Sequence, residues 1–426
     1  MALLSPQLQR FISTSLCRHD ASSCRTSASA GAAVNRGGGG GVVSVAHARH
    51  RCSAIAIEAP SSMTDVAPIR FGYTSLQGPR EEMEDAIVIR SDGLDGFSFA
   101  AVFDGHAGSS SVRFLSEELY KECVGQLQGG SLLSGGDFTA IKEALLKAFE
   151  NVDQNLLKWL EANGEEDESG STATVLFIRN GISFISHIGD SCVVLSRSGQ
   201  AEELIDSHRP FGSSKASLQE IRRIREAGGW IVNGRICGDI AVSRAFGDIR
   251  FKTKKYEMLQ KGVEEGRWSE KFVSRIRFKG DLVIATPEIY QVPLASDVEF
   301  VVLASDGLWD YMNRFPFLVS LSLPINPLSA FESQICVSRF SSDVVKYVRD
   351  QLRKHGNVQL ACEALAQAAL DQRSQDNISI IIADIGRTDW RNLPVQKPNT
   401  VLELVQALAT IGIVSFGIWM SSYLSL

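Results

Sequence analysis

The sequence lacks any pair of cysteines spaced as Cys-x-x-Cys, although its 426 residues include eight cysteines. Zinc sites and small disulfide-rich domains both depend on closely and regularly spaced cysteines. We therefore expect separate thiols in a reducing compartment, with neither structural zinc nor a disulfide framework. Three of the cysteines lie before residue 53, and the other five are scattered at Cys123, Cys192, Cys237, Cys336 and Cys362.

The chain also lacks a strong basic patch and an internal repeat. Its formal net charge is −6 at pH 7, and 44% of its residues are hydrophobic. Proteins that bind nucleic acid usually carry clustered Lys and Arg, so we expect no nucleic-acid partner. The composition is that of a globular domain, apart from the two ends of the chain.

Acidic residues are nearly absent from the first 57 residues, where Asp20 is the only acid among six arginines and many Ser, Ala and Gly residues. Such a composition is typical of organelle transit peptides, and a secretory signal would need an apolar core of about 7 to 15 residues that is missing here. The start MALLS and the glycine run at 37–41 favour a plastid. We expect 1–57 to be a disordered chloroplast transit peptide; a disordered tail without a targeting role is the alternative.

Charged residues are equally scarce at 401–424, where Glu403 is the only one. About 20 apolar residues, at a rise of ~1.5 Å each, span a bilayer core of ~30 Å. The apolar residues at 408–420 surround the helix axis, which disfavours the alternative of an amphipathic helix packed on the domain surface. We expect a transmembrane helix at 401–424, preceded by a polar, proline-containing linker at 388–400.

Between these ends, runs rich in β-branched and aromatic residues are separated by turn residues, which predicts many short strands. An Asn-Gly pair at 180–181 predicts a tight hairpin. Several strands follow one another without a helix between them. We therefore expect an α+β domain at 58–387, a two-sheet antiparallel β-sandwich flanked by helices in α/β/β/α layers, rather than a doubly wound parallel sheet. The predicted strands are 85–90, 97–103, 171–178, 181–189, 192–197, 281–289, 299–305 and 377–385, and the predicted helices are 110–124, 138–164 and 358–374.

Acidic residues recur where these predicted strands begin or end. Any one of them alone would ordinarily be a solvated turn residue. Carboxylates that meet repel one another, so a repeated arrangement of this kind predicts one or two hard divalent cations among them. Oxygen ligands favour Mg²⁺ or Mn²⁺, and two such ions can polarise a phosphoryl group and activate water. The acids are Glu84, Asp85, Asp104, Asp190, Asp306, Asp310 and Asp376.

Nine short stretches between residues 71 and 386 resemble, in order, those of the metal-dependent serine/threonine protein phosphatases of type 2C. They are QGPREEMEDA, FAAVFDGHAG, SGSTATV, HIGDSCVVLSRSG, HRPFG, AGGWI, VSRAFGD, VVLASDGLWD and RSQDNISIII. The resemblance implies a two-sheet sandwich flanked by helices, two Mg²⁺ or Mn²⁺ ions at one edge, and phosphoserine or phosphothreonine proteins as substrates.

The resemblance also implies roles for the metal ligands. Asp104 would bridge both ions, and the carbonyl of Gly105 would bind one of them. Glu84 would contact an ion through water, while Asp306 and Asp376 would complete the shell of the other ion.

Further positions match the family's catalytic residues and a third, weaker metal site, at Asp190 and Asp310. Arg80 would bind the substrate phosphate, Asp85 would orient a metal-bound water, and His106 would protonate the leaving oxygen during direct in-line attack without a phosphoenzyme. The alternatives are that His106 is a packed histidine and that Arg80 is an ordinary surface cation.

Two stretches depart from the family pattern. The family's Asp-His-Lys/Arg-Pro reads Ser-His-Arg-Pro here, with Ser207 in place of the acid. Residues 314–340 look inserted, and their apolar, proline-bearing composition fits neither a solvated loop nor a helix. They are either translated non-coding sequence or a lid close to the active site. The basic segment 250–283 occupies the place of a flap that tunes substrate choice in the family.

The whole layout resembles thylakoid members of the family that dephosphorylate light-harvesting complex II, the antenna of photosystem II, and so reverse state transitions. It implies a location at the chloroplast thylakoid membrane with the catalytic domain facing the stroma. Two alternatives remain: a phosphatase for photosystem II core phosphoproteins, and a membrane-tethered binding module whose catalysis is impaired by 314–340.

Overall fold

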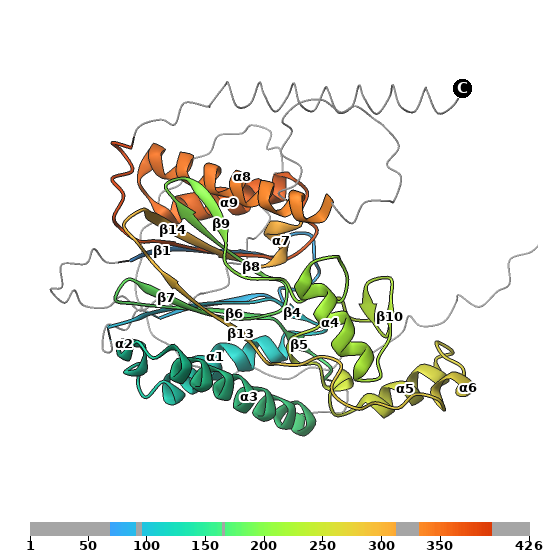
Figure 1. The fold of residues 1–426 in the computed structure, drawn as a ribbon. Coiled ribbons are helices and arrows are strands. Elements are labelled where there is room, and N and C mark those ends of the chain that lie inside the picture. The colour runs from blue at the N-terminus through green and yellow to red at the C-terminus, as the bar shows by residue number, and fades with distance from the viewer. Residues whose placement is uncertain (1–68, 91–95, 164–166, 312–331, 394–426) are drawn as a thin grey trace, which may run out of the picture. The chain divides into compact units, whose positions relative to one another are not determined.

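A computed structural model describes residues 69–90, 96–163, 167–311 and 332–393 (Figure 1). The predicted transit peptide, most of the predicted insertion, most of the linker and the predicted transmembrane helix at 401–424 lie outside the described residues, so these remain predictions. Within the described ranges, no helix is both long enough and apolar enough to cross a membrane.

Two five-stranded sheets form the centre of the described part, and every strand pairing in both is antiparallel. The first sheet has the order β1 (Arg70–Leu76), β15 (Ile378–Asp384), β14 (Val298–Ala304), β8 (Cys192–Arg197) and β9 (Gln200–Glu203). The second has the order β13 (Glu288–Pro293), β7 (Ile182–Ile188), β6 (Ala173–Arg179), β3 (Ser98–Phe103) and β2 (Ala86–Arg90).

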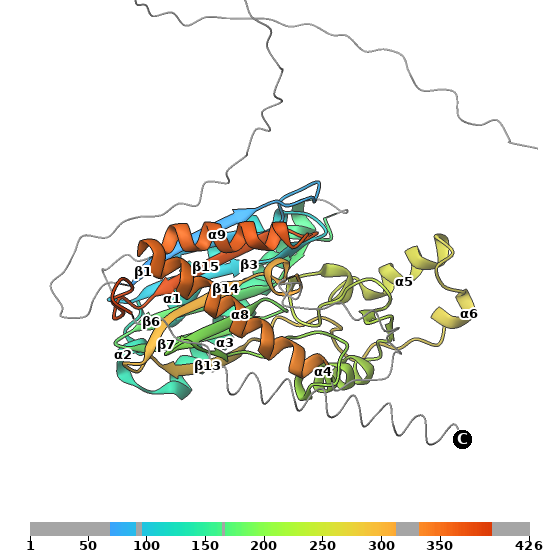
Figure 2. The same ribbon diagram turned by 90° about the horizontal axis from the view of Figure 1, so that it is seen from above.

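Long helices cover the outer face of each sheet (Figures 1 and 2). Helices α1 (Ser110–Gln126) and α3 (Phe138–Asn163) cover the second sheet, and α8 (Glu332–His355) and α9 (Val358–Asp371) cover the first. The apolar face of α9 repeats at the helical period, with Ala361, Leu365 and Ala369 buried against the sheet. The structure thus confirms the expected α+β fold with antiparallel sheets.

Burial on both faces explains the nearly continuous apolar runs of the central strands. All seven residues of β14 and all seven of β15 are buried. Side chains such as Val102, Leu303 and Ile381 fill the space between the two sheets, while their neighbours along each strand face the helices. Because successive strand residues point to opposite faces, a strand covered on both sides needs apolar residues throughout.

Shorter elements occupy the edge of the sandwich and its flank. Three two-residue strands form a small sheet in the order β12 (Phe246–Gly247), β5 (Gly170–Ser171) and β4 (Gly105–His106). The remaining short elements are α2 (Leu132–Gly135), α4 (Lys215–Glu226), β10 (Ile231–Val232), β11 (Arg235–Ile236), η1 (Ile249–Phe251), α5 (Lys255–Glu264), α6 (Glu270–Val273) and α7 (Asp306–Trp309).

The predicted hairpin is present between β6 and β7, where Asn180 and Gly181 have φ angles of 51° and 75°. The predicted strand at 281–289 is mostly wrong, because β13 begins only at Glu288 and the preceding Leu282 and Val283 are buried in a separate apolar cluster beside α5. Helix α8 begins at Glu332, inside the segment whose composition predicted no helix. Its later residues Val344 and Val348 pack on the first sheet and make the helix favourable there.

The first described strand, β1, pairs with the last, β15, so the two ends of the described domain lie in the same sheet. The register runs from Arg70 opposite Asp384 to Leu76 opposite Ile378. The cysteines of the described part are free thiols, as expected from their spacing, at Cys123, Cys192, Cys237 and Cys362.

Candidate metal centre and active site

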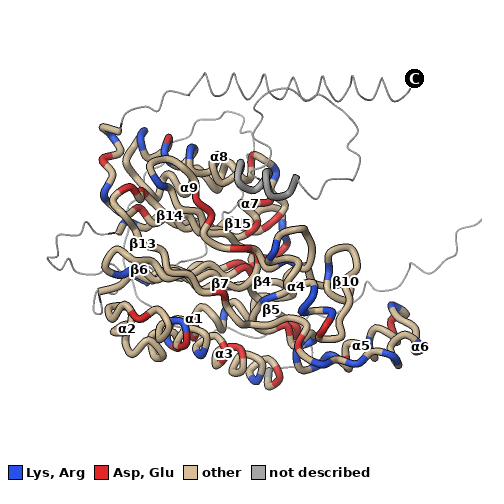
Figure 3. Tube along the Cα trace, viewed as in Figure 1, with Lys and Arg blue, Asp and Glu red and all other residues tan. Residues whose placement is uncertain are grey.

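The predicted acids lie at one edge of the sandwich, where strands of both sheets begin or end. Figure 3 shows acidic residues in red along this part of the trace, near α7, β15 and β4. Asp104 directly follows β3, and Asp190 lies in the turn between β7 and β8. Asp306 begins α7 just after β14, while Asp376 lies two residues before the start of β15 at Ile378. Carboxylate oxygens of Asp104, Asp190 and Asp306 all lie within 4.8 Å of one another.

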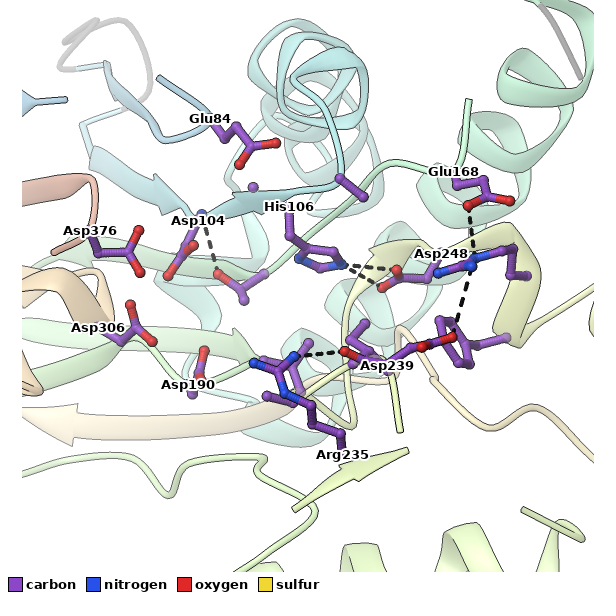
Figure 4. A pocket seen from close by; sticks show the side chains of 18 of the residues that line it. Glu84, Asp104, His106, Glu168, Asp190, Arg235, Asp239, Asp248, Asp306 and Asp376 are labelled. Carbon is purple, nitrogen blue, oxygen red and sulfur yellow. Dashed lines mark hydrogen bonds and ion pairs between the residues drawn. The ribbon is translucent and has the colours of Figure 1, made fainter. Parts of the chain in front are cut away.

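These residues line a cleft of about 390 Å³, in which the carboxylates of Asp104, Asp306 and Asp376 point toward a common space (Figure 4). Eight of the ten predicted site residues line it; Asp85 lies behind the cleft wall, and Asp310 lines a neighbouring hollow. The eight are Arg80, Glu84, Asp104, Gly105, His106, Asp190, Asp306 and Asp376.

The clustered acids destabilise one another's charged forms. Burial raises the pKa of Asp104 well above its usual value, and the charges of Asp85 and Asp306 raise it further. Burial likewise raises the pKa of Asp306, with added repulsion from Asp190. A site that concentrates carboxylates in this way is stabilised by bound cations, and its all-oxygen donor set fits Mg²⁺ or Mn²⁺.

Asp85 supports this centre from behind. Its side chain is buried, at 7% exposure, and accepts a hydrogen bond of 2.8 Å from the hydroxyl of Ser305, the residue before Asp306. Burial raises the pKa of Asp85 to about 7, even though the hydrogen bond from Ser305 lowers it. Asp85 therefore ties the start of β2 to the end of β14, one residue from a predicted metal ligand on each side.

Glycine at position 105 allows the chain to pass close to Glu84. A Cβ atom there would lie 2.4 Å from the carbonyl oxygen of Glu84 and 2.6 Å from Cγ2 of Val112, so no side chain fits. The Glu84 carboxylate accepts a hydrogen bond of 2.6 Å from the backbone N–H of Gly108. The β4–α1 connection thus fixes the carboxylate of Glu84 at the cleft.

Arg80 is held at the rim by the residues that precede β15. Its Nη2 donates to Oδ2 of Asp376 at 2.7 Å, and its Nε donates to the carbonyl of Gln375 at 3.0 Å. The other oxygen of Asp376 accepts from the backbone N–H of Asn377 at 2.8 Å. Half of the Arg80 side-chain surface, 51%, remains exposed. A guanidinium oriented in this way can contact an anion entering the cleft.

His106 is paired with Asp248, a residue that sequence analysis missed. Nε2 of His106 lies 2.9 Å and 3.0 Å from the two carboxylate oxygens of Asp248, which is only 3% exposed (Figure 4). Burial lowers the pKa of His106, but the charge and the hydrogen bond of Asp248 outweigh it, so the pKa is raised overall. The available signal was the Gly-Asp of VSRAFGD, which repeats the Gly-Asp of HIGDSC.

The local backbone brings this pair together. Asp248 has a φ of 55° and a ψ of 49°, a left-handed conformation, and its N–H donates to the carbonyl of Ser169 at 3.0 Å. At Gly170, a Cβ atom would lie 2.4 Å from Nε2 of His106 and 2.6 Å from Cγ of Asp248. The small sheet of β4, β5 and β12 therefore leaves just enough space for the ion pair.

Arg209 is a second residue at the centre that sequence analysis did not include. It lies between β9 and α4, in the stretch that reads Ser-His-Arg-Pro. Its Nε donates to Asp190 at 2.8 Å, and its Nη2 donates to Asp306 and to Asp310, each at 3.1 Å. The residue type alone carried no sign of these contacts, because the partners are up to 101 residues away in the sequence.

Similar proteins give an independent view of the chain. The profile of the family described as Protein phosphatase 2C matches residues 69–315. Protein phosphatase 2C 57 of Arabidopsis thaliana is 71% identical over 426 residues, which cover 100% of both chains. Probable protein phosphatase 2C 11 of the same plant is 34% identical over 262 residues, or 60% of this chain and 58% of the relative. Mouse Protein phosphatase 1B is 29% identical over 323 residues, or 74% and 70%.

Solved structures share the fold. The serine-threonine phosphatase 2C of Toxoplasma gondii matches 77% of this chain and 98% of its own, with a TM-score of 0.53 at 19% identity. A sex-determining protein of Caenorhabditis elegans matches 76% of this chain and 67% of its own, with a TM-score of 0.54 at 21% identity. At such identities the similarity concerns the fold alone.

Proposed function

Because the chain belongs to the protein phosphatase 2C family, we propose that it dephosphorylates light-harvesting antenna proteins of photosystem II at the thylakoid membrane. The coarser activity follows from family membership: the chain is a metal-dependent protein serine/threonine phosphatase. One observation assigns this activity to particular residues: acidic residues from both sheets line a single cleft together with Arg80 and His106.

The donor set in the cleft fits the divalent ions on which this family depends. Asp104 and Asp306, whose oxygens lie close together, would hold them with Asp376 and the carbonyl of Gly105. Bound Mg²⁺ or Mn²⁺ ions neutralise these carboxylates, polarise a phosphoryl oxygen and lower the pKa of water. The raised pKa values of Asp104 and Asp306 are the expected property of such a site before it is filled.

The chain's own residues bind the phosphate and move the proton. Arg80 lies at the rim with its guanidinium fixed by Asp376, so it can bind two phosphate oxygens side by side. Asp248 favours the protonated form of His106, because its carboxylate lies against Nε2 and raises the pKa of the ring. The remaining ring nitrogen, Nδ1, then gives its proton to the departing serine or threonine oxygen. Asp85 supports the loop that begins with Ser305 and Asp306.

The activity is tested with the full-length protein, Mn²⁺ and a phosphothreonine peptide. We expect Asp104→Asn and Asp306→Asn each to lower phosphate release about a hundredfold or more, because each removes a charge that the ions require. A matched control is Asp297→Asn, which removes the same charge at a surface carboxylate paired with Arg197. Folded Asp104→Asn and Asp306→Asn proteins that release phosphate as fast as the parent protein in the same Mn²⁺ buffer would disprove the proposed site.

The proposed substrate and location are supported by the ends of the chain. Residues 1–57 have the composition of a chloroplast transit peptide, and 401–424 have that of a transmembrane helix. Together with a phosphatase domain, this layout resembles thylakoid enzymes that act on light-harvesting complex II. The catalytic domain would then face the stroma.

The substrate is tested on thylakoids from plants that lack the protein, by phosphothreonine immunoblot after a change of light. Persisting phosphorylation of the antenna supports the proposal. Persisting phosphorylation of the photosystem II core proteins alone would instead favour that alternative substrate. Complementation with Asp104→Asn separates an enzyme from a binding module, since only a binding module would restore the normal pattern without its predicted metal ligand.

The location is tested by protease treatment of intact thylakoids that contain the full-length protein. Digestion of the phosphatase domain by added protease is expected if the domain faces the stroma. Full protection from protease, or recovery of the protein in another compartment, would contradict the proposed location.

A further inference from the structure

The contacts of Arg209 concern the residues that match the family's third, weaker metal site. That site was predicted at Asp190 and Asp310, and both carboxylates are bound to the Arg209 guanidinium. The same Nη2 atom that contacts Asp310 also contacts Asp306, at 3.1 Å. One side chain therefore joins three carboxylates, with its Nε on one side and its Nη2 on the other.

The guanidinium and a divalent ion would compete for the same space. Arg carries five N–H donors in a planar fork and accepts no ligand, so it satisfies several carboxylates at once. An ion that bound the same oxygens would lie within a few ångströms of the guanidinium, where two positive centres repel strongly at low dielectric. Asp190 has 6% of its side chain exposed and Asp310 has 46%, so water screens this repulsion less on the Asp190 side than on the Asp310 side.

The chain segment that carries Arg209 is fastened to the turn that carries Asp190. The N–H of His208 donates to the carbonyl of Gly189 at 2.7 Å, and the N–H of Gly189 donates to Nδ1 of His208 at 3.2 Å. The guanidinium carbon also lies 5.8 Å from the centre of the Phe211 ring. The hydrogen bonds of His208 fix the backbone next to Arg209 close to Asp190, and the Phe211 ring lies beside the guanidinium; both favour the position in which Arg209 binds the carboxylates.

We propose that Arg209 takes the place of a third divalent ion and thereby limits the metal centre to two ions. Asp190 and Asp310 then serve as anchors for the guanidinium rather than as metal ligands. Arg209 is a positioning residue in this arrangement, because it acts on the metal centre through Asp306. The inference concerns the number of ions and holds whichever phosphoprotein is the substrate.

The test counts Mn²⁺ ions bound to the metal-free, full-length protein by equilibrium dialysis and titration calorimetry. We expect two ions per chain in the parent and three in Arg209→Gln, with the third bound at least about tenfold more tightly than any third ion in the parent, since one fixed positive charge is gone. The matched control is Arg197→Gln, which removes the same charge at a surface ion pair with Glu202 and should bind two ions.

Two outcomes would overturn the proposal. Three ions in both proteins with affinities within about twofold would show that the guanidinium does not exclude the ion, and two ions in both would show that the freed carboxylates form no site. If Arg209 only stabilised the fold, Arg209→Gln would lower the stability of the protein without binding an additional Mn²⁺ ion.

A measurement on the parent protein avoids dependence on the variant's folding. Crystals soaked in Mn²⁺ are expected to show two anomalous peaks, with the guanidinium between Asp190 and Asp310. A third peak at that position, with Arg209 displaced, would overturn the proposal. Phosphatase assays on the same samples report on the proposed function separately, because loss of activity does not alter the count of peaks.

Discussion

Asp248 controls the proton on His106, because it contacts Nε2 with both oxygens and raises the pKa of the ring. A raised pKa means that the protonated form persists to higher pH and is lost only above it. In Asp248→Asn the pKa of His106 should fall, so the alkaline limb of kcat/KM should move to lower pH. The pH profile at saturating Mn²⁺ measures this shift.

Asp239→Asn is the control for that profile, because Asp239 also lines the cleft but pairs with Arg267 and not with His106. The alkaline limb of its kcat/KM profile should lie at the same pH as that of the parent protein. Equal limbs in Asp248→Asn and the parent would show that another group donates the proton.

A side chain at position 170 should disrupt the same pair. The Cβ of Gly170→Ala would lie 2.4 Å from Nε2 of His106, so the histidine or Asp248 must move. We expect kcat to fall about tenfold or more, since small misplacements of a catalytic group are costly. Gly125→Ala in α1 is the control, because its Cβ meets nothing within 4 Å. Unchanged turnover by Gly170→Ala would contradict the assigned role of the pair.

Among single residues, those that share a repeated sequence pattern could be predicted, whereas those without such a pattern could not. Glu84, Asp104, Asp306 and Asp376 were found because an acid at the end of a buried strand recurs. Asp248 lies 142 residues from its partner His106, and no local spacing relates the two. The contacts of Arg209 depend in the same way on how distant turns meet, which composition does not encode.

The helix α3 fixes the segment that carries Asp248. Lys252, which is 2% exposed, donates to both oxygens of Asp153 on α3, at 2.6 Å and 2.7 Å, and Asp153 also accepts from the N–H of Gly247. Lys252→Met should lower the free energy of unfolding by about 3 to 5 kcal/mol, because it leaves a largely buried carboxylate without its partner. Urea denaturation monitored by circular dichroism measures the change.

The double variant Lys252→Met with Asp153→Leu should recover part of that loss, since removing both charges leaves no unpaired group. A single variant within 1 kcal/mol of the parent, a threshold well below the ~3 kcal/mol expected for a broken buried pair, would show that the ion pair does not stabilise this junction.

Elements with a clean period were predictable, whereas elements set by tertiary contacts were not. The periodic stretch at 138–164 became α3, and the Asn-Gly hairpin formed as expected. Residues 282–283 looked like part of a strand but pack in an apolar cluster beside α5, because buried apolar runs do not themselves specify strand pairing. Strand β1 was not distinguished, since its residues are only partly buried.

The stability of the whole domain should depend on metal and pH together. Burial raises the pKa of Asp85 to about 7 and that of Asp104 well above its usual value. A carboxyl group whose pKa is higher in the folded state stabilises that state when protonated, so this contribution is lost as pH rises from about 4 towards 7. Above that pH range bound ions offset the charge of the buried carboxylates, and below it protons compete with the ions for the same oxygens.

We therefore expect Mn²⁺ to raise Tm more at pH 8 than at pH 6, with a shift on the order of 5 °C at a hundredfold excess over Kd. Differential scanning fluorimetry with chelator or Mn²⁺ at both pH values checks this. Asp104→Asn should show a smaller shift at pH 8 than the parent. A shift that is equal at the two pH values would contradict the coupling of protons and ions at these carboxylates.

The layered architecture could be predicted because strands followed one another without helices between them and a tight hairpin joined two of them. The sequence did not indicate which helix covers which sheet. That assignment depends on long-range packing, such as Leu115 and Phe149 against the second sheet and Leu365 against the first.

The pairing of β1 with β15 determines where anything attached to the domain can be joined. Leu76 and Ile378 lie at the end of this pair nearest Arg80 and Asp376, whereas Arg70 and Asp384 lie at its other end, roughly 20 Å along the strands. Trp390 still contacts Asp384, at 2.9 Å. A linker fused before residue 69 or after residue 393 therefore starts far from the cleft. The enzyme can be attached to a bead or a lipid surface through either end while the cleft stays accessible to a large protein substrate.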